Sequence, residues 1–277
     1  MLDARLAALD AELAPLPGVL VAFSGGVDSG VVLAAAVRAL GADRVVAATA
    51  VSPSLPAAER VAAAEFVASL GVRHEQPRTD ELSREGYRAN AGDRCAFCKS
   101  ELIDVLTPLA ARLGIADVVT GTNADDLRAG FRPGIRAAAE RGAWAPLARA
   151  GMTKDDVRAA ARLWDLPLAD KPAAACLASR IAYGVPVSAE GLARVEAAET
   201  ALRSALAEAG LEVRNLRVRD MGEDVARVEV DAALVPDVVA RPHLLDAVAG
   251  FQRVDVDPRG FRSGSMNELL PDPVRYR

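Results

Sequence analysis

An apolar run, a short polar turn and a second apolar run place the strongest constraint on how this chain can fold. Residues 18–23 read GVLVAF, residues 24–29 read SGGVDS, and residues 30–37 read GVVLAAAV. This order is typical of a buried strand, a tight turn and a helix. Two glycines and two serines would then present backbone N–H groups and hydroxyls at a helix N-terminus, where the helix dipole favours an anion. The segment therefore predicts a phosphate-binding turn.

The turn differs from two common nucleotide-binding motifs. It lacks the Gly-Lys-Ser/Thr ending of nucleoside-triphosphatase P-loops and the G-x-G-x-x-G pattern of dinucleotide folds. It resembles instead the SGGxDS loop of the PP-loop ATP pyrophosphatases, which cleave ATP to AMP and pyrophosphate while adenylating a substrate. The resemblance implies an ATP site that contains Ser24, Gly25, Gly26, Asp28 and Ser29. The simpler alternative is a Gly-Gly turn that only connects a strand to a helix.

The composition favours a small-molecule partner. Of 277 residues, 51% are hydrophobic and only 4% are aromatic, so Ala, Val and Leu should make up most of the core. The net charge of −5 gives no general attraction to nucleic acids or anionic membranes. No apolar run reaches about 18 residues, and residues 1–10 follow an amphipathic helix pattern. We therefore expect a cytoplasmic protein that binds neither membranes nor nucleic acids.

Alternating strand and helix patterns continue after the turn. We expect a helix at 57–70 and strands at 44–50, 72–75 and 117–120. A further helix should begin after Thr153, whose hydroxyl can cap it. This alternation predicts an α/β fold with a doubly wound parallel sheet, which the PP-loop resemblance identifies as adenine nucleotide α-hydrolase-like. Ligands bind at the carboxyl ends of such strands, so the loops at Ser24, Ser52 and Gly121 should converge on one ATP crevice.

The pattern changes near residue 187, which predicts a second domain. We divide the chain into a PP-loop domain at 1–170, a junction at 171–186 and a small α+β domain at 187–277 that binds substrate phosphate. In the small domain we expect a helix to about residue 209, a helical stretch interrupted at Pro242, and strands at 211–219, 225–230 and 253–257.

Carboxylates follow the expected strand at 117–120, in the segment GTNADD at 121–126. The strand end would deliver them to the ATP phosphates, so Gly121, Asn123 and Asp125 complete the predicted ATP site. Mg²⁺ takes carboxylate and phosphate oxygens, which makes Asp28 and Asp126, or Asp125 in its place, candidate ligands. The alternative is an Asx-type turn that only caps the next segment.

Three cysteines, Cys95, Cys98 and Cys176, form a Cys-x-x-Cys pair and a distant third thiol. An odd number in a long cytoplasmic chain argues against a disulfide framework and for metal or redox chemistry. Three thiolates can bind three irons of a [4Fe–4S] cluster and leave the fourth iron open, or they can bind zinc with a fourth ligand. The only histidines, His74 and His243, lack zinc-finger spacing, so a cluster is the better interpretation. Unrelated buried thiols are the remaining alternative.

Further motifs resemble the LarE family, the ATP-dependent sulfur transferases of nickel-pincer nucleotide cofactor synthesis, over nearly the whole chain. They lie at residues 24–29, 94–99 (RCAFCK), 121–126, 131–134 (FRPG), 171–172 (KP), 176–184 (CLASRIAYG) and 260–268 (GFRSGSMNE). The resemblance implies adenylation of pyridinium-3,5-biscarboxylic acid mononucleotide and its conversion to a thiocarboxylate. It also implies a homo-oligomer.

The family has two types, which differ in the source of sulfur. In one type a cysteine that matches Cys176 gives up its own sulfur and is left as dehydroalanine. In the other, a Cys-x-x-Cys pair joins that cysteine in holding a [4Fe–4S] cluster, and a sulfide donor supplies the sulfur. Because Cys95, Cys98 and Cys176 are all present, the cluster type is our hypothesis, with Cys176 and Asp28 as catalytic residues.

The ribose phosphate of such a substrate requires cationic anchors. Arg217 and Arg219 alternate along one expected strand and can form bidentate pairs with a phosphate, while Arg180 and Arg262 are weaker candidates. Alternatively, the strand arginines are simply solvated. The family strand usually continues with a histidine, whereas this chain has Asp220 followed by Met221.

Two rival enzyme classes share the fold. A tRNA thiolase would use the same three cysteines, but it needs a broad basic surface that the acidic composition does not favour. An amide-forming synthetase, such as an NAD or GMP synthetase, would leave the three cysteines without a role.

Overall fold

The structure is a computed structural model that describes residues 1–128, 133–172 and 175–270. The described chain divides into two compact units: unit 1 comprises 1–81 and 95–172, and unit 2 comprises 82–94 and 175–270. Residues 82–94, which the sequence analysis assigns to the first domain, thus pack with unit 2. Phe131 and Arg132 of the family motif at 131–134 lie outside the described residues.

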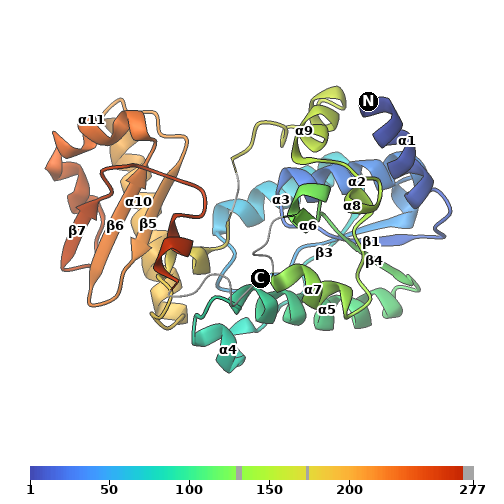
Figure 1. Cartoon of the computed structure of the whole chain (residues 1–277), viewed down its shortest axis with the longest axis horizontal. Coiled ribbons are helices and arrows are strands. Elements are labelled where there is room, and N and C mark those ends of the chain that lie inside the picture. Colours follow the sequence, from blue (N-terminus) through green and yellow to red (C-terminus); the bar gives the residue numbers. More distant parts are fainter. Residues whose placement is uncertain (129–132, 173–174, 271–277) are drawn as a thin grey trace. The chain divides into compact units, whose positions relative to one another are not determined.

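A four-stranded parallel sheet forms the centre of unit 1. Its strands are β1 (Val19–Ala22), β2 (Val45–Ala48), β3 (Arg73–Glu75) and β4 (Asp117–Thr120), in the order β3-β2-β1-β4 (Figure 1). All three pairings are parallel, and β1 lies between β2 and β4. The predicted α/β fold with a parallel sheet of adenine nucleotide α-hydrolase type is therefore confirmed.

Helices cover both faces of this sheet. Alternate residues of β1 point to opposite faces, so Val19 and Val21 join one apolar core while Leu20 and Ala22 join another. The first core is closed by α1 (Leu2–Leu13), α2 (Val27–Leu40), α3 (Ala57–Ser69) and α9 (Lys154–Leu163). The second is closed mainly by α5 (Arg94–Arg112) and α7 (Pro133–Ala139), below the sheet in Figure 1. Short elements complete the unit: η1 (Ala42–Arg44), η2 (Glu81–Ser83), α6 (Ala124–Arg128) and α8 (Pro146–Arg149).

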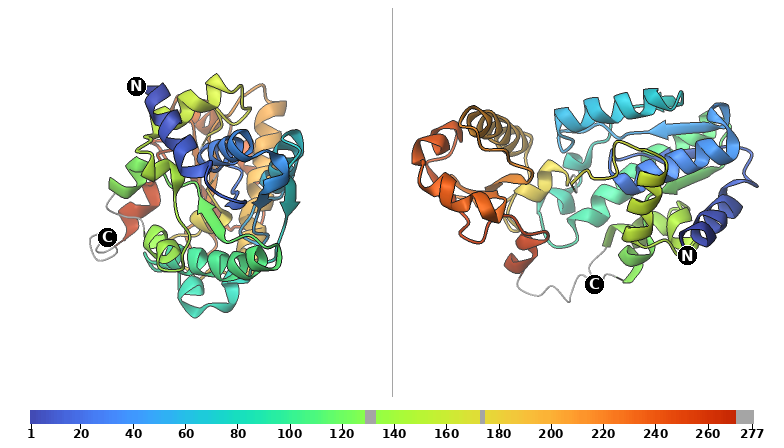
Figure 2. Two further views of the ribbon diagram at one scale, coloured as in Figure 1. Left: turned by 90° about the vertical axis from the view of Figure 1, so that its right-hand side faces the viewer. Right: turned by 90° about the horizontal axis from the view of Figure 1, so that it is seen from above.

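Unit 2 is built on a three-stranded mixed sheet in the order β5-β6-β7. The strands are β5 (Leu216–Asp220), β6 (Val225–Val230) and β7 (Arg253–Val256); β6 pairs antiparallel with β5 and parallel with β7. The long helix α10 (Ala189–Glu208) lies along the sheet (Figure 2), and its buried apolar residues join the core of this unit. The other elements are α4 (Glu85–Arg88), η3 (Leu177–Arg180), η4 (Ala232–Leu234), α11 (Val235–Val239), η5 (Pro242–Ala247) and η6 (Ser265–Leu269).

One strand boundary differs from the sequence prediction. The expected strand at 211–219 begins only at Leu216. The backbone N–H groups of Arg214 and Asn215 bond the carboxylate of Asp231, at 2.7 and 3.0 Å, so a side chain takes the place of a strand partner there. Within the described residues, no helix has the length and apolar character needed to cross a membrane.

Candidate active site

The turn between β1 and α2 has the form expected of a phosphate-binding loop. Gly25 has φ +76°, a conformation that favours glycine, and Gly26 is the N-cap of α2, so this position carries no side chain over the first helical turn. The Ser29 hydroxyl accepts from the Ser24 backbone N–H at 3.2 Å and donates to the Gly26 carbonyl at 3.1 Å. The two serine hydroxyl oxygens lie 3.1 Å apart. Hydroxyls and the positive end of a helix dipole are thus gathered at one turn, where an anion is favoured.

The loop after β4 packs directly against this turn. A Cβ at Gly121 would lie 2.5 Å from the Ser29 nitrogen and 2.8 Å from its Cα, so only glycine permits the approach. The Nδ2 group of Asn123 then donates to Oδ1 of Asp28 at 2.9 Å. Two of the predicted site segments therefore meet at Asp28.

Asp28 also forms an ion pair with Lys154, the first residue of α9. The backbone N–H of Lys154 donates to Oδ2 of Asp125 at 2.8 Å, which joins the start of α9 to the same group of residues. Lys154 had not been identified as a site residue. The sequence marks Thr153 as a helix cap, but nothing in it shows that the following side chain reaches Asp28.

Asn123 and Asp126 form a reciprocal cap at the start of α6. Oδ1 of Asn123 accepts from the backbone N–H groups of Asp125 and Asp126 at 2.9 and 3.0 Å, and Oδ2 of Asp126 accepts from that of Asn123 at 3.2 Å. This is the Asx-type turn that the sequence analysis left open. Across the described ranges, no three His, Cys, Asp or Glu side chains are grouped to hold a metal ion. Magnesium binding by Asp28 and Asp126 stays a prediction, in which nucleotide phosphates supply further ligands.

A second lysine lies at the other end of the turn. Nζ of Lys171 donates to the Gly25 carbonyl at 3.0 Å and to Oε2 of Glu59, on α3, at 2.6 Å. The sequence analysis uses Lys171 only as part of a family motif and does not consider Glu59. Long-range ion pairs of this kind have no local sequence pattern.

The cysteine pair begins α5. Cys95 and Cys98 are three residues apart, a spacing that places both thiols on one side of the helix. Cys95 is exposed, whereas the half-buried Cys98 donates a weak bond to Oε1 of the buried Glu81 at 4.0 Å. Burial lowers the pKa of the neighbouring Lys99, and the thiols of Cys98 and Cys95 partly oppose this decrease.

The third cysteine belongs to unit 2. Cys176 is exposed and is the N-cap of η3. Nη1 of Arg180 donates to its carbonyl oxygen at 3.1 Å and also bonds the carbonyl of Ala175. Arg180 therefore fixes the backbone that carries the thiol.

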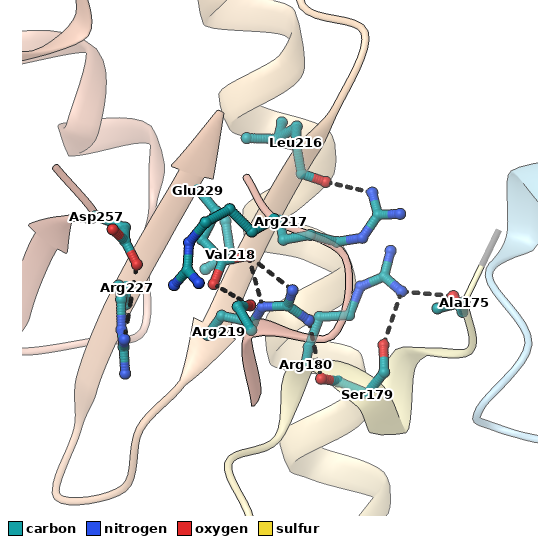
Figure 3. Close-up of polar contacts among 12 residues, drawn as sticks. Ala175, Ser179, Arg180, Leu216, Arg217, Val218, Arg219, Arg227, Glu229 and Asp257 are labelled. Atoms are coloured by element: carbon teal, nitrogen blue, oxygen red, sulfur yellow. Dashed lines mark hydrogen bonds and ion pairs between the residues drawn. The ribbon is translucent and has the colours of Figure 1, made fainter. Parts of the chain in front are cut away.

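A buried group of charged side chains, here called the arginine cluster, lies between β5, η3 and α10 in unit 2 (Figure 3). Its members are Arg180, Arg217, Arg219, Glu199 and Glu229. Arg180 makes two bonds to Glu199, at 2.9 and 3.0 Å. Arg219 makes two bonds to Glu229, at 3.1 and 2.7 Å, and a third to the Ser179 carbonyl at 2.9 Å.

Arg217 lies in the same cluster. It donates to the Leu216 carbonyl at 2.7 Å and stacks over the Phe261 ring at 5.1 Å. Burial, followed by the like charge of Arg180, lowers the pKa of Arg217 to about 10. Arg217 and Arg219 are only 8% and 5% exposed, so the alternative that they are simply solvated is wrong. Among the described residues, this cluster thus brings three arginines and two glutamates together.

The remaining predicted residues have other partners. Arg262 pairs with Glu268, which also binds Arg259 at 3.1 Å. Asp220 is buried and pairs with Arg194, while the sulfur of Met221 accepts from Arg227 at 3.0 Å. The Asp220–Met221 departure from the family pattern is thus accommodated by arginine partners within unit 2.

Comparison with known proteins places these features in a family. A family model described as NAD synthase matches residues 10–91, which include the phosphate-binding turn. A protein named pyridinium-3,5-bisthiocarboxylic acid mononucleotide synthase, from Lactiplantibacillus plantarum, is 35% identical over 272 residues, which cover 97% of this chain and 96% of that protein. The chain belongs to the LarE family. It is therefore a member of a family of ATP-dependent sulfurtransferases that contain a PP-loop domain.

A second relative agrees over the full length of this LarE-family chain. An uncharacterised protein of Synechocystis sp. is 41% identical over 275 residues, 98% of this chain and 99% of that protein. The similarity therefore extends over both units of this chain, rather than over the nucleotide-binding segment alone.

Proposed function

We propose that this chain adenylates a carboxylate of pyridinium-3,5-biscarboxylic acid mononucleotide and converts it to a thiocarboxylate, in the synthesis of the nickel-pincer nucleotide cofactor. The observation that carries the proposal is the arginine cluster, in which three buried arginines face two glutamates. A group of buried arginines in a LarE-family chain suits a substrate that carries a phosphate.

Adenylation prepares the carboxylate for attack. A carboxylate oxygen attacks the α-phosphorus of ATP, and pyrophosphate leaves, so the acyl carbon acquires AMP as its leaving group. The turn at Ser24, Gly25, Gly26 and Ser29 supplies hydroxyls and a helix N-terminus to the departing pyrophosphate. Asp28 would bind the Mg²⁺ that accompanies ATP, with Asp126 or Asp125 as a further ligand.

The arginine cluster would hold the substrate's ribose phosphate. Burial and the like charge of Arg180 lower the pKa of Arg217, so its charged form is disfavoured in the absence of an anion. A phosphate dianion beside it would restore favourable electrostatics, with Arg180 and Arg219 as further donors. Arg262 would contribute only by exchanging its bond to Glu268.

Sulfide then completes the reaction. The sulfur attacks the acyl carbon, AMP leaves with the former carboxylate oxygen, and the thiocarboxylate forms with release of a proton. We propose that Cys95, Cys98 and Cys176 would hold a [4Fe–4S] cluster, which would supply sulfide for this step. The exposure of Cys95 and Cys176, and the helical spacing of Cys95 and Cys98, suit thiolate donors to such a cluster.

The test is anaerobic turnover of the iron- and sulfide-reconstituted protein with ATP, Mg²⁺, sulfide and the biscarboxylic mononucleotide. We expect AMP, pyrophosphate and thiocarboxylate in equal amounts, with more than one thiocarboxylate per chain. A single turnover in which Cys176 becomes dehydroalanine and its sulfur appears in the thiocarboxylate would establish the self-sacrificing alternative instead. Sulfur incorporation into tRNA without thiocarboxylate formation would favour the tRNA thiolase, and amide formation from ammonia would favour a synthetase.

A further inference from the structure

The choice of cationic residues in this chain is strongly biased. The sequence contains 30 arginines but only three lysines, Lys99, Lys154 and Lys171. All three belong to unit 1. Exposed ion pairs use arginine instead, as in Arg73–Glu75 and Arg162–Asp170. Lysine is thus rare in this chain, and its compact ammonium group on a flexible stem differs from the planar guanidinium of arginine.

Two of the three lysines contact the phosphate-binding turn. Lys171 bonds the carbonyl of Gly25, and Lys154 pairs with Asp28. Their side chains are 19% and 39% exposed, so solvent reaches both ammonium groups. Each lysine also has a carboxylate partner, Glu59 for Lys171 and Asp28 for Lys154.

The turn by itself provides limited positive charge. A helix N-terminus is equivalent to about half a unit charge, whereas pyrophosphate carries several negative charges at neutral pH. Phosphoryl-group transfer therefore usually employs lysine or arginine in addition to backbone donors. A lysine on a flexible stem can exchange a carboxylate for a phosphate oxygen with a small movement.

We propose that Lys171 and Lys154 bind the β- and γ-phosphates of ATP and retain the departing pyrophosphate, and that Glu59 and Asp28 hold the two ammonium groups until the nucleotide binds. This inference rests on the ATP-dependent step of the proposed function. Glu59 and Lys171 form the informative pair, because Asp28 is also assigned to Mg²⁺.

The test measures binding of three probes, Mg·ATP, Mg·pyrophosphate and AMP, by titration calorimetry. Lys171→Met should weaken ATP and pyrophosphate binding by about tenfold or more, the change that corresponds to about 1.4 kcal/mol, and leave AMP binding unchanged. Glu59→Gln should keep or tighten pyrophosphate binding, because it releases the ammonium group. Lys154→Met should repeat the Lys171→Met pattern, and the exposed control Arg162→Met should bind all three probes as the parent does.

A structural ion pair predicts a different result. If Lys171 only fastens its segment to α3, Lys171→Met and Glu59→Gln will lower the unfolding temperature equally and leave pyrophosphate affinity unchanged, which overturns the proposal. Lys171→Arg adds a second check. If a compact ammonium group is needed to exchange the Glu59 carboxylate for a phosphate oxygen, arginine at this position will not restore full pyrophosphate affinity. Full restoration would show that charge alone suffices and would overturn the argument from lysine usage.

These measurements need no acceptor substrate, so they separate the two proposals. Parent protein that binds pyrophosphate through Lys171 but forms no thiocarboxylate would contradict the proposed function alone. Parent protein that forms thiocarboxylate, with Lys171→Met and Lys154→Met binding pyrophosphate normally, would contradict the lysine assignment alone.

Discussion

Arg217 is a charged residue held where the fold gains little from its charge. Its side chain is buried beside Arg180, and its pKa falls to about 10. Removing a guanidinium from water is expensive unless a carboxylate or phosphate compensates it. In the proposed function the substrate brings a phosphate to this arginine.

Replacing Arg217 by Met should therefore separate stability from function. We expect the free energy of unfolding at neutral pH to rise, because burial and Arg180 disfavour the charged form of Arg217 and an apolar side chain of similar length avoids that cost. The KM for the mononucleotide should rise, with little change in ATP binding. Denaturant unfolding and steady-state kinetics measure the two effects, with the exposed Arg253→Met as the control.

The stability gain should depend on pH in a defined direction. Arg217 has a lower pKa in the folded protein than in the unfolded chain. Above about pH 10 the unfolded state therefore binds more protons than the folded state, and the free energy of unfolding of the parent protein rises with pH. The advantage of Arg217→Met should shrink as the pH rises through about 10. A higher stability for the parent than for Arg217→Met at pH 7 would contradict this account.

At the scale of the elements, the start of α9 links helix capping to the active site. Thr153 and Asp156 form a capping box: the Thr153 hydroxyl accepts from the Asp156 backbone N–H, and Asp156 accepts from the Thr153 backbone N–H at 3.0 Å. The cap places Lys154 at the first helical position, from which it reaches Asp28.

The capping box makes an acid-sensitive contribution to stability. Hydrogen bonds from Thr153 lower the pKa of Asp156 in the folded protein. The Asp156 carboxylate therefore stabilises the fold fully above pH 3.8, its pKa in the unfolded chain, and this stabilisation is lost as the pH falls through the lower pKa of the folded protein. Asp156→Asn should lower the unfolding temperature at pH 7, and its difference from the parent should diminish below pH 3.8. Thr153→Ala should cost about 1 kcal/mol at neutral pH. A pH-independent difference between Asp156→Asn and the parent would refute the assignment.

Gly121 illustrates how a residue can define a site without touching a ligand. A Cβ there would overlap the backbone of Ser29 in the first turn of α2. Gly121→Ala should move that turn, destabilise the protein by about 1–3 kcal/mol and weaken ATP binding. Gly142→Ala is a useful comparison, because no atom lies within 4 Å of its Cβ position. Any loss of stability there comes from the positive φ of Gly142 and not from a steric overlap. Equal ATP affinities for the parent and Gly121→Ala would show that the close approach is dispensable.

At the scale of the whole molecule, the cysteines are divided between the two units, with Cys95 and Cys98 in unit 1 and Cys176 in unit 2. A cluster that requires all three thiolates would connect segments that are distant in the sequence. Ligands that bind only the folded state raise its apparent stability, so cluster binding should do the same.

Serine substitution of any one cysteine should reduce the iron and acid-labile sulfide bound per chain after anaerobic reconstitution. The parent protein should also unfold at a higher temperature with the cluster than without it, and each single variant should lose that increase. Chemical iron analysis and calorimetry provide the measurements. Full iron content in Cys176→Ser would remove Cys176 from the cluster and return it to the self-sacrificing role.

Local sequence patterns were sufficient for much of the fold and for the phosphate-binding turn. Strand and helix periodicity depend on neighbours along the chain, as do caps such as Thr153, so the bounds of β1 and the start of α9 could be predicted closely. Helix α2 begins at Val27, three residues before the apolar run at 30–37. The arginines at 217 and 219 could be named for the same reason, because residues two apart share one face of a strand.

The sequence alone determined the α/β class, the turn at residues 24–29 and the three cysteines as the chemical features of this chain. Only the tertiary structure decided that Arg217 and Arg219 are buried, that Lys154 pairs with Asp28 and that Lys171 reaches Gly25. The physical reason is distance along the chain: these last two contacts join residues 126 and 146 positions apart. Burial and charge pairing at such separations arise from packing, and no periodicity in the sequence encodes them.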